Sequence, residues 1–454
     1  MSFKSWGVKV ALVVAGTLMA AACGGSGTSN TSNGVGYGKN QPDVTINFWY
    51  MPNGAEPDQY FQQQASAFEA VHPNITVKGT NVSWGDALNK LTAAVTSGVG
   101  PDVTQLGTTW VGTLSKAGGL HQFSQGEING MGGQSAFNAA SWKTGELAGT
   151  NQLTAAPWFI DTRAIYYRKD VFQRLGIDPA TAFKDWNSTD QTLAKIKAAG
   201  IQPLGMPGKK AFDVVHNFAP WVWGAGGDYL NKNGTQAAFD SPAAVDGVNE
   251  LLTLAAKYVD PAVLQQDNNT VEAMFAQGKF AVMFDGSFLN QQFSVPASQQ
   301  GYQGSVADQA GIGTVPFPAG PKANNVFFGG SDLAIMKSSQ HEAAAYEFVR
   351  WLTGDKSQEQ YVNQVGLIPA RNSSAKAAVF TGNANLQAFL NQLNRGRSYP
   401  TIAAWGQIES ALVADYGKMF DAVAQSGGPL PRSQVQTMVQ SANQDITAAI
   451  QQSS

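Results

Sequence analysis

The chain has 454 residues with 29 lysines and arginines and 32 aspartates and glutamates, a net charge of −3, so it lacks the basic excess that binds nucleic acid. Charged residues make up only 13% of it and aromatic residues 10%, which favours a ligand recognised by neutral hydrogen bonds and ring faces over an ionic one. The length allows two or three domains.

The N-terminus has the layout of a secretory signal peptide. Lys4 and Lys9 precede an apolar run over residues 10–22 that ends in small residues and is short for a membrane span. Residues 1–22 are therefore predicted to be removed and the rest of the chain to be exported. Cys23 is the only cysteine, which excludes a disulfide framework.

Cys23 stands where bacterial lipoproteins carry their lipidated cysteine. The alanines at 20–22 resemble a lipobox, although Ala20 stands where leucine is usual. Two acyl chains on Cys23 would anchor the protein to the outer face of the cytoplasmic membrane. The alternative is a secreted protein with one free thiol. After Cys23, residues up to 41 are rich in Gly, Ser and Asn, so 23–41 are predicted to form a lipidated, flexible tether.

Strands alternate with helices from residue 42 onward. The hydrophobic pattern predicts strands at 43–50, 75–80 and 101–107, and helices at 60–73, 86–98 and 108–120. The stretch APWFIDTRAIYYRKD, 156–170, reads as a further strand whose period of two places Asp161 and Arg163 on one face. The alternation predicts an α/β fold with helices on both faces of parallel sheets.

The second half of the chain continues the alternation. Helices are predicted at 170–176, 190–200, 241–259 and 341–354, a strand at 201–206, and a short helix, a turn at Gly278 and a buried strand within 272–286. A Trp-rich segment covers 216–230, and the region from about 380 is predicted to be Gln-rich helix.

Motifs for catalysis or cofactor binding are missing from the sequence. The histidines are scattered, at His72, His121, His216 and His341, and HEAAAY lacks the second histidine of a zinc helix. There is no GxSxG elbow, no Walker A loop and no GxGxxG after a strand. The sequence therefore predicts no enzyme, no cofactor and no metal site.

Several segments together resemble the extracellular substrate-binding proteins of ABC importers, in the sugar-binding group called solute-binding family 1. They are GPDVTQLGTTWVGTLSKAGGL, APWFIDTRAIYYRKDVFQRLGI, FAQGKFAVMFDGS, FFGGSDLAIMKSS with EAAAYEFVRWLTG, and VGLIPARNSS. They follow the family's order and spacing over essentially the whole mature chain. One departure is Arg168, where many members carry Asn or Asp.

The resemblance implies a type II periplasmic-binding-protein fold, in which two discontinuous α/β lobes are joined by a hinge and enclose a ligand cleft. By analogy the chain crosses between lobes near 157–161, 314–317 and 351–355. The expected lobes are 42–158 plus 315–352, and 159–314 plus 353–454.

Asp161 and Arg163 are the first candidates for ligand contact, because the hinge strand would carry them along the cleft. A guanidinium offers a fork of donors and a carboxylate accepts two hydroxyls, which suits vicinal sugar hydroxyls. The alternative is an internal pair that braces the hinge.

The other candidates combine aromatic platforms with polar groups at strand ends, the features that a sugar site needs. The alternatives are core packing for the tryptophans, helix capping for Thr109 and tight turns for the glycine segments. Trp221 and Trp223 project oppositely if their segment is extended, so only one of them is expected to reach the cleft. The remaining candidates are Asn53, Glu56, Thr109, Trp110, Trp158, Trp221, Trp223, Asp285, Ser287, Gly330, Ser331 and Trp405.

The expected function is that a membrane-anchored monomer captures an extracellular carbohydrate, of the oligosaccharide class, and delivers it to ABC permease subunits. One alternative is the same fold tuned to a polyamine, a metal complex or a peptide. Another is a secreted glycosidase that uses Asp161 with Asp285 or Glu56. The identity of the sugar depends on the placement of donors that spacing does not reveal.

Overall fold

The computed structural model describes residues 36–208 and 213–453. The predicted signal peptide at 1–22 and the predicted lipid site at Cys23 lie outside the described residues. Within the described ranges, no helix combines the length and apolar character needed to cross a membrane.

The described strands form one ten-stranded mixed sheet. Its order is β2-β1-β3-β8-β4-β6-β5, while β7 and β9 pair with β4 and β10 pairs with β8. The strands are β1 (Val44–Tyr50), β2 (Ile75–Asn81), β3 (Val103–Gly107), β4 (Ala156–Arg168), β5 (Leu204–Gly205), β6 (Val282–Gly286), β7 (Ile312–Val315), β8 (Val326–Ile335), β9 (Ile368–Pro369) and β10 (Gly396–Arg397).

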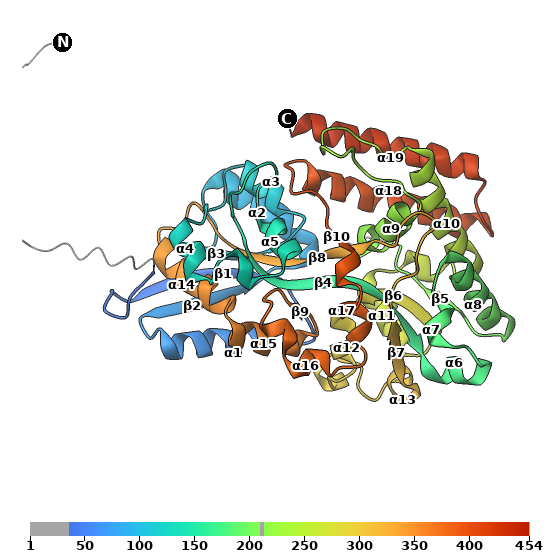
Figure 1. The fold of residues 1–454 in the computed structure, drawn as a ribbon, viewed down its shortest axis with the longest axis horizontal. Coiled ribbons are helices and arrows are strands. Elements are labelled where there is room, and N and C mark those ends of the chain that lie inside the picture. The colour runs from blue at the N-terminus through green and yellow to red at the C-terminus, as the bar shows by residue number, and fades with distance from the viewer. Residues whose placement is uncertain (1–35, 209–212, 454) are drawn as a thin grey trace, which may run out of the picture. The chain divides into compact units, whose positions relative to one another are not determined.

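The strand β4 connects the two parts of this sheet. Residues 156–162 pair antiparallel with β8, whereas residues 163–167 pair antiparallel with β6 and residues 165–168 with β7. Figure 1 shows β4 and β8 running between the elements around β1–β3 and those around β5–β6. Asp161 and Arg163 therefore lie where β4 changes its pairing partner.

Helices surround the sheet (Figure 1). The first half of the chain contains α1 (Pro57–Val71), α2 (Trp84–Ser97), α3 (Val111–Lys116), α4 (Gln125–Gly130), α5 (Ala139–Gly145), α6 (Lys169–Leu175), α7 (Pro179–Ala182), α8 (Trp186–Ala198) and α9 (Asp213–Gly224). The second half contains α10 (Pro242–Tyr258), α11 (Asn268–Ala276), α12 (Phe288–Gln292), α13 (Val306–Ala310), α14 (Glu342–Leu352), α15 (Asp355–Val365), α16 (Ala378–Thr381), α17 (Gln387–Leu390), α18 (Trp405–Ser426) and α19 (Arg432–Gln452).

Most predicted elements are confirmed, and three segments differ. The strand expected at 201–206 is reduced to Leu204–Gly205. The Gln-rich region does not become a long helix until α18 begins at Trp405, because Gly382, Gly396 and Pro400 interrupt the preceding segment. The Trp-rich segment is largely the helix α9 rather than an extended stretch.

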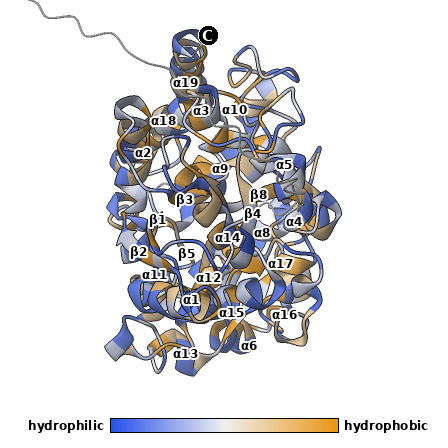
Figure 2. Ribbon diagram, turned by 90° about the vertical axis from the view of Figure 1, so that its left-hand side faces the viewer, coloured by the Kyte–Doolittle hydropathy of each residue, from blue (hydrophilic) through white to orange (hydrophobic). Residues whose placement is uncertain are grey.

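The apolar residues of the described chain are almost all removed from solvent. The large hydrophobic side chains that remain exposed are Val71, Val99 and Val306 within those residues. In Figure 2 the helices carry both hydrophilic and hydrophobic residues. The aromatic residues of the candidate functional site are therefore part of a packed interior, not of an open surface.

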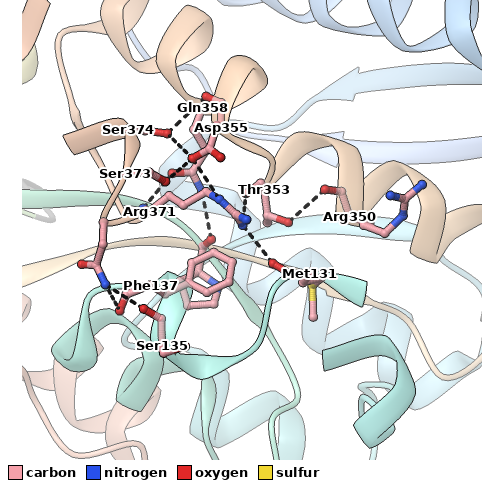
Figure 3. A network of polar contacts seen from close by, with 12 residues as sticks. Met131, Ser135, Phe137, Arg350, Thr353, Asp355, Gln358, Arg371, Ser373 and Ser374 are labelled. Atoms are coloured by element: carbon pink, nitrogen blue, oxygen red, sulfur yellow. Dashed lines mark hydrogen bonds and ion pairs between the residues drawn. The ribbon is translucent and has the colours of Figure 1, made fainter. Parts of the chain in front are cut away.

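Arg371, from the VGLIPARNSS segment, holds together three stretches that are distant in the sequence (Figure 3). Its Nη1 donates to the carbonyls of Met131 at 2.9 Å and Thr353 at 3.1 Å, and its Nε donates to Asp355 Oδ1 at 3.1 Å. The guanidinium also lies 5.2 Å from the ring centroid of Phe137. The segment before α5 is thereby attached to the start of α15.

Gly330 in β8 provides a test of the close contact between β8 and β4. Its φ is +129°, and a Cβ atom there would lie 2.0 Å from the carbonyl oxygen of Phe159. We expect Gly330→Ala to lower the free energy of unfolding by at least about 2 kcal/mol, since the strained backbone and the clash add together. Urea denaturation measures this loss.

Gly85 is the matched control, because a Cβ there meets nothing within 4 Å and the residue lies exposed in α2. Gly85→Ala should leave stability unchanged or raise it by up to about 1 kcal/mol. Equal urea midpoints for the two variants would contradict the packing described for Gly330.

Candidate functional site

Arg163 is the centre of a buried charge cluster beside the middle of β4. Its side chain is 1% exposed and forms ion pairs with Asp161 on the same strand and with Asp213 at the start of α9. The guanidinium also lies 6.0 Å from the ring centroid of Phe288 and 5.5 Å from that of Phe327. Burial alone would lower the pKa of Arg163, but the neighbouring carboxylates outweigh it and raise the pKa.

Asp285 and Ser287, at the end of β6, adjoin this cluster. Gly286 pairs directly with Arg163, and an oxygen of Asp161 lies 2.7 Å from the position of a Cβ on Gly286. Burial raises the pKa of Asp285 to about 8, against the opposing effect of Arg163. Ser287 is fully buried and its hydroxyl has no hydrogen-bond partner among the described residues. We call Asp161, Arg163, Asp213, Asp285 and Ser287 the Arg163 cluster.

An aromatic group centred on Tyr399 lies next to the Arg163 cluster. The ring of Tyr399 stacks on Trp405 with centroids 4.3 Å apart and lies 5.6 Å from the ring of Trp223. His216 on α9 joins the two clusters, because its ring stacks on Phe327 at 3.8 Å while its Nδ1 is 3.3 Å from the Tyr399 hydroxyl. Burial, together with Arg163, lowers the pKa of His216 well below its usual range, so this ring is neutral.

Glu409 on α18 links the aromatic group to the end of β3. Its Oε2 accepts hydrogen bonds from Thr109 Oγ1 at 2.9 Å and from Trp110 Nε1 at 3.1 Å. Glu409 is 2% exposed, and burial raises its pKa to about 8 despite these two donors. Trp110 begins α3 as its N-cap residue without a capping side chain, so Thr109 bonds to Glu409 and does not cap the helix.

Several buried polar atoms without a partner lie in these clusters or, for Asn217, beside His216 on α9. In each of several residues, one buried polar atom has no hydrogen-bond partner within the described part of the chain. Buried polar atoms without a partner are rare in protein interiors. They are Asp161 Oδ1, Arg163 Nε, Asn217 Oδ1, Trp223 Nε1, Asp285 Oδ2, Ser287 Oγ, Trp405 Nε1 and Glu409 Oε1. A ligand that both donates and accepts hydrogen bonds would satisfy them.

Three of the predicted residues belong to a different group, which brings together side chains from β3, β4, β8 and α15. Asn53 Nδ2 donates to Tyr361 Oη at 2.9 Å and to Gln105 Oε1 at 3.3 Å, and Gln105 Nε2 donates to Ser331 Oγ at 2.9 Å. Trp158 stacks on Tyr361 with centroids 4.5 Å apart. Asn53, Ser331 and Trp158 are thus brought together, around Tyr361 and Gln105 and not around Arg163.

The last three predicted residues have contacts of their own. Trp221 is fully buried among Trp186, Phe284 and Phe317, with ring centroids 5.4 to 6.1 Å away. Gly330 allows β8 to approach β4, and its carbonyl accepts from Thr108 N at 3.1 Å. Glu56 is the half-buried N-cap residue of α1 and makes no capping bond there.

Sequence reasoning missed Asp213, Tyr399 and Glu409, which complete the clusters. Asp213 lies just before the Trp-rich segment and Glu409 lies four residues after Trp405. The position of Glu409 one helical turn from a candidate tryptophan was the one signal that could have indicated it.

A surface pocket beside α10 lies elsewhere and has a volume of about 340 Å³. Its lining includes Lys197, Lys257 and Tyr258, as well as Gly427 after α18. Lys257 pairs with Asp190 at 3.0 Å, and Lys197 donates to the carbonyl of Lys257 at 2.6 Å. Because its cations already have partners and no orphaned polar atom lines it, we assign it no ligand. Within 36–208 and 213–453, no group of three or more metal-ligating side chains is arranged around a common point.

Comparison with known proteins identifies relatives over most of the chain. Residues 32–359 match the family model of bacterial extracellular solute-binding proteins. The chain is 28% identical over 412 residues to the diacetylchitobiose binding protein DasA of Streptomyces coelicolor, which covers 88% of this chain and 90% of that protein.

Solved structures resemble this one closely in fold. The GacH receptor of Streptomyces glaucescens gives a TM-score of 0.74 at 22% identity, over 90% of this chain and 99% of that one. The sugar-binding protein MalE of Xanthomonas citri gives 0.71 at 22% identity, over 90% and 98%. These likenesses confirm the expected type II periplasmic-binding-protein fold.

Removing the cation of the Arg163 cluster should be strongly destabilising. Arg163→Met would leave Asp161 and Asp213 facing each other without a positive charge, so we expect a loss of about 3–5 kcal/mol in the free energy of unfolding. Arg432→Met is the control, since Arg432 pairs with Asp246 at the surface and its side chain is 49% exposed. That change should cost less than about 1 kcal/mol. Similar urea midpoints for both variants would contradict a buried, paired Arg163.

Glu409 should make stability depend on pH. Its pKa is about 8 in the folded protein, above the ordinary value of 4.5, so the folded state binds more protons between these two values. The free energy of unfolding of the wild type should therefore fall, relative to Glu409→Gln, as the pH rises from about 4.5 to 8. Thermal unfolding of both proteins across this range measures the difference.

Glu127 gives a control of opposite sign. It is a buried acid whose pKa is lowered, because hydrogen bonds from His121 and Ser124 outweigh burial. The wild type should therefore gain stability relative to Glu127→Gln as the pH rises towards the ordinary glutamate value of 4.5, with no further gain from this group above it. A parallel pH response of the two variants would refute the burial assigned to Glu409.

Proposed function

Because the chain belongs to the family of bacterial extracellular solute-binding proteins, we propose that it captures an extracellular carbohydrate of more than one sugar unit and delivers it to the permease of an ABC importer. The ligand cleft lies beside the middle of β4, between the Arg163 cluster and the aromatic group of Tyr399. The protein acts by binding and closure, without catalysis.

The observation that carries this proposal is the set of orphaned polar atoms next to aromatic rings. Carboxylate oxygens of Asp161 and Asp285, the hydroxyl of Ser287 and the indole nitrogens of Trp223 and Trp405 are buried and lack partners within the described residues. A saccharide offers hydroxyls, which both donate and accept, and apolar C–H faces that suit rings. One class of ligand therefore matches both features.

The relatives support a carbohydrate. DasA is named as a diacetylchitobiose binding protein, the GacH receptor was solved with acarbose, and MalE of Xanthomonas citri is described as sugar-binding. Each of these names refers to the relative itself, and the transfer to this chain is our inference.

We also propose that the chain forms two lobes that close over the ligand, with the cleft at the middle of β4. Contacts of α15 and β9 favour one change to the boundaries expected from the sequence. Ser357 donates to Gln64 at 2.8 Å, Tyr361 accepts from Asn53, and Arg371 bonds to Met131, so residues 353–371 contact the first lobe. We therefore place the third crossing after Arg371 instead of at 351–355. When the lobes close, the ligand contacts both of them and so holds them together.

Membrane attachment is proposed on the sequence alone. The basic and apolar layout of 1–22 and the small residues before Cys23 support export and lipidation, which would hold the protein as a monomer at the outer face of the cytoplasmic membrane.

A cationic solute such as a polyamine is the second candidate, because carboxyl groups outnumber cations in the site. Asp161 and Asp213 share the single guanidinium of Arg163, and Asp285, Glu272 and Glu409 are buried beyond them. A ligand with ammonium groups would pair with these acids.

A thermal-shift screen of the full chain in mild detergent distinguishes the candidates. The probes are diacetylchitobiose, maltotriose, acarbose, spermidine, amino acids and ferric citrate. Ligand at about a hundred times its dissociation constant stabilises the native state by about 2.7 kcal/mol, which gives a clear rise in melting temperature. We expect a saccharide to produce the largest shift, with no cleavage products on chromatography.

A shift with spermidine and none with any saccharide would replace the proposed ligand by the second candidate. Cleaved saccharide would contradict the proposal that the protein only binds. If no probe shifted the melting temperature, the assignment of the cleft would be overturned.

A further inference from the structure

The two carboxyl oxygens of Glu409 are used differently. Oε2 is fixed by the Thr109 hydroxyl and the Trp110 indole, whereas Oε1 has no partner among the described residues. Two donors on one oxygen hold the carboxyl group in a single orientation. The free oxygen therefore has a defined direction.

The surroundings of Glu409 belong to the proposed cleft. Asp213 of the Arg163 cluster is near enough to raise the pKa of Glu409, and Glu409 in turn raises the pKa of Tyr399. Trp405 lies one turn earlier on α18, so its side chain and that of Glu409 share a face of the helix. The indole nitrogen of Trp405 is also without a partner in the described structure.

One face of α18 thus presents an unused donor and an unused acceptor, both at least 98% buried. Leaving such groups without partners is costly, because burial removes the water that would otherwise bond to them. A hydroxyl group can satisfy both, since it donates to one atom and accepts from another. An ammonium group can satisfy only the carboxyl oxygen.

We propose that Glu409 is a specificity-determining residue of the ligand site, whose free oxygen accepts a hydrogen bond from a ligand hydroxyl or ammonium while Thr109 and Trp110 hold it in place. This inference rests on the proposed function. It predicts two roles for Glu409: the residue links α18 to the end of β3, and it also raises the affinity for the ligand.

The variant Glu409→Gln separates the two roles. The amide oxygen can still accept from Thr109 and Trp110, so the link to β3 persists, but the group at the position of Oε1 becomes an NH₂ donor. The acceptor is thereby exchanged for a donor at nearly constant shape. We expect Glu409→Gln to bind about 10- to 100-fold more weakly above pH 8, where the Glu409 carboxyl group is ionised and offers a charged hydrogen bond. Glu409→Ala should lose affinity and also melting temperature.

The probes are three β-linked disaccharides that differ only at C2: cellobiose with a hydroxyl, diacetylchitobiose with an acetamide, and deacetylated chitobiose with an ammonium. Maltotriose adds a different linkage. Affinities are measured by calorimetry on the full chain in mild detergent for the wild type, both Glu409 variants and Glu127→Gln. Glu127 is a buried glutamate with bonded oxygens away from the site, so Glu127→Gln should bind like the wild type.

The outcomes separate the inference from the function on which it rests. Weaker binding by Glu409→Gln without a lower melting temperature than the wild type, with binding by Glu127→Gln unaffected, supports the inference. A preference for deacetylated chitobiose would identify an ammonium as the ligand group that Glu409 binds. Wild-type affinity in Glu409→Gln and Glu409→Ala would overturn the inference and leave the carbohydrate function standing. Failure of the wild type to bind any saccharide would overturn the function, and this inference with it.

Discussion

The two buried ion pairs of Arg163 are the interaction on which the arrangement of the site depends. A guanidinium that is 1% exposed would be too costly without carboxylate partners, and it finds one within β4 and another at the start of α9. Asp213 therefore fixes the position of α9 against β4. Because α9 carries His216 and Trp223, the same pairs determine where these rings meet Tyr399. A charge contact made for stability thus also positions the aromatic side of the site.

Glu409 performs the corresponding task from the C-terminal helices. Its bonds to Thr109 and Trp110 attach α18 to the end of β3, and the stacking of Trp405 on Tyr399 attaches the same helix to the aromatic group. Two elements distant in sequence, α9 and α18, are therefore held around the middle of β4 by one acid each.

The sequence predicted most of the elements and part of the site, because both depend on local signals. Period-two alternation identified β4 and the shared face of Asp161 and Arg163, and glycines marked helix ends such as Gly98. The partners Asp213 and Glu409 could not be predicted, since their roles arise from packing between distant segments. Likewise, Trp221 and Trp223 project differently from α9, and only the neighbours decide that the first joins Trp186 and the second joins Tyr399.

In the proposed mechanism, the buried polar atoms without partners are the physical reason for ligand-driven closure. Asp285 Oδ2 and Ser287 Oγ belong to one side of the site, and Glu409 Oε1 and Trp405 Nε1 to the other. Bringing these groups together without a ligand incurs a desolvation cost that no protein partner offsets. A ligand that bonds to both sides removes the cost only when they face each other, so its affinity is greater for the closed arrangement. That difference in affinity is what a transporter would sense, and it requires polar groups that the protein itself leaves unsatisfied.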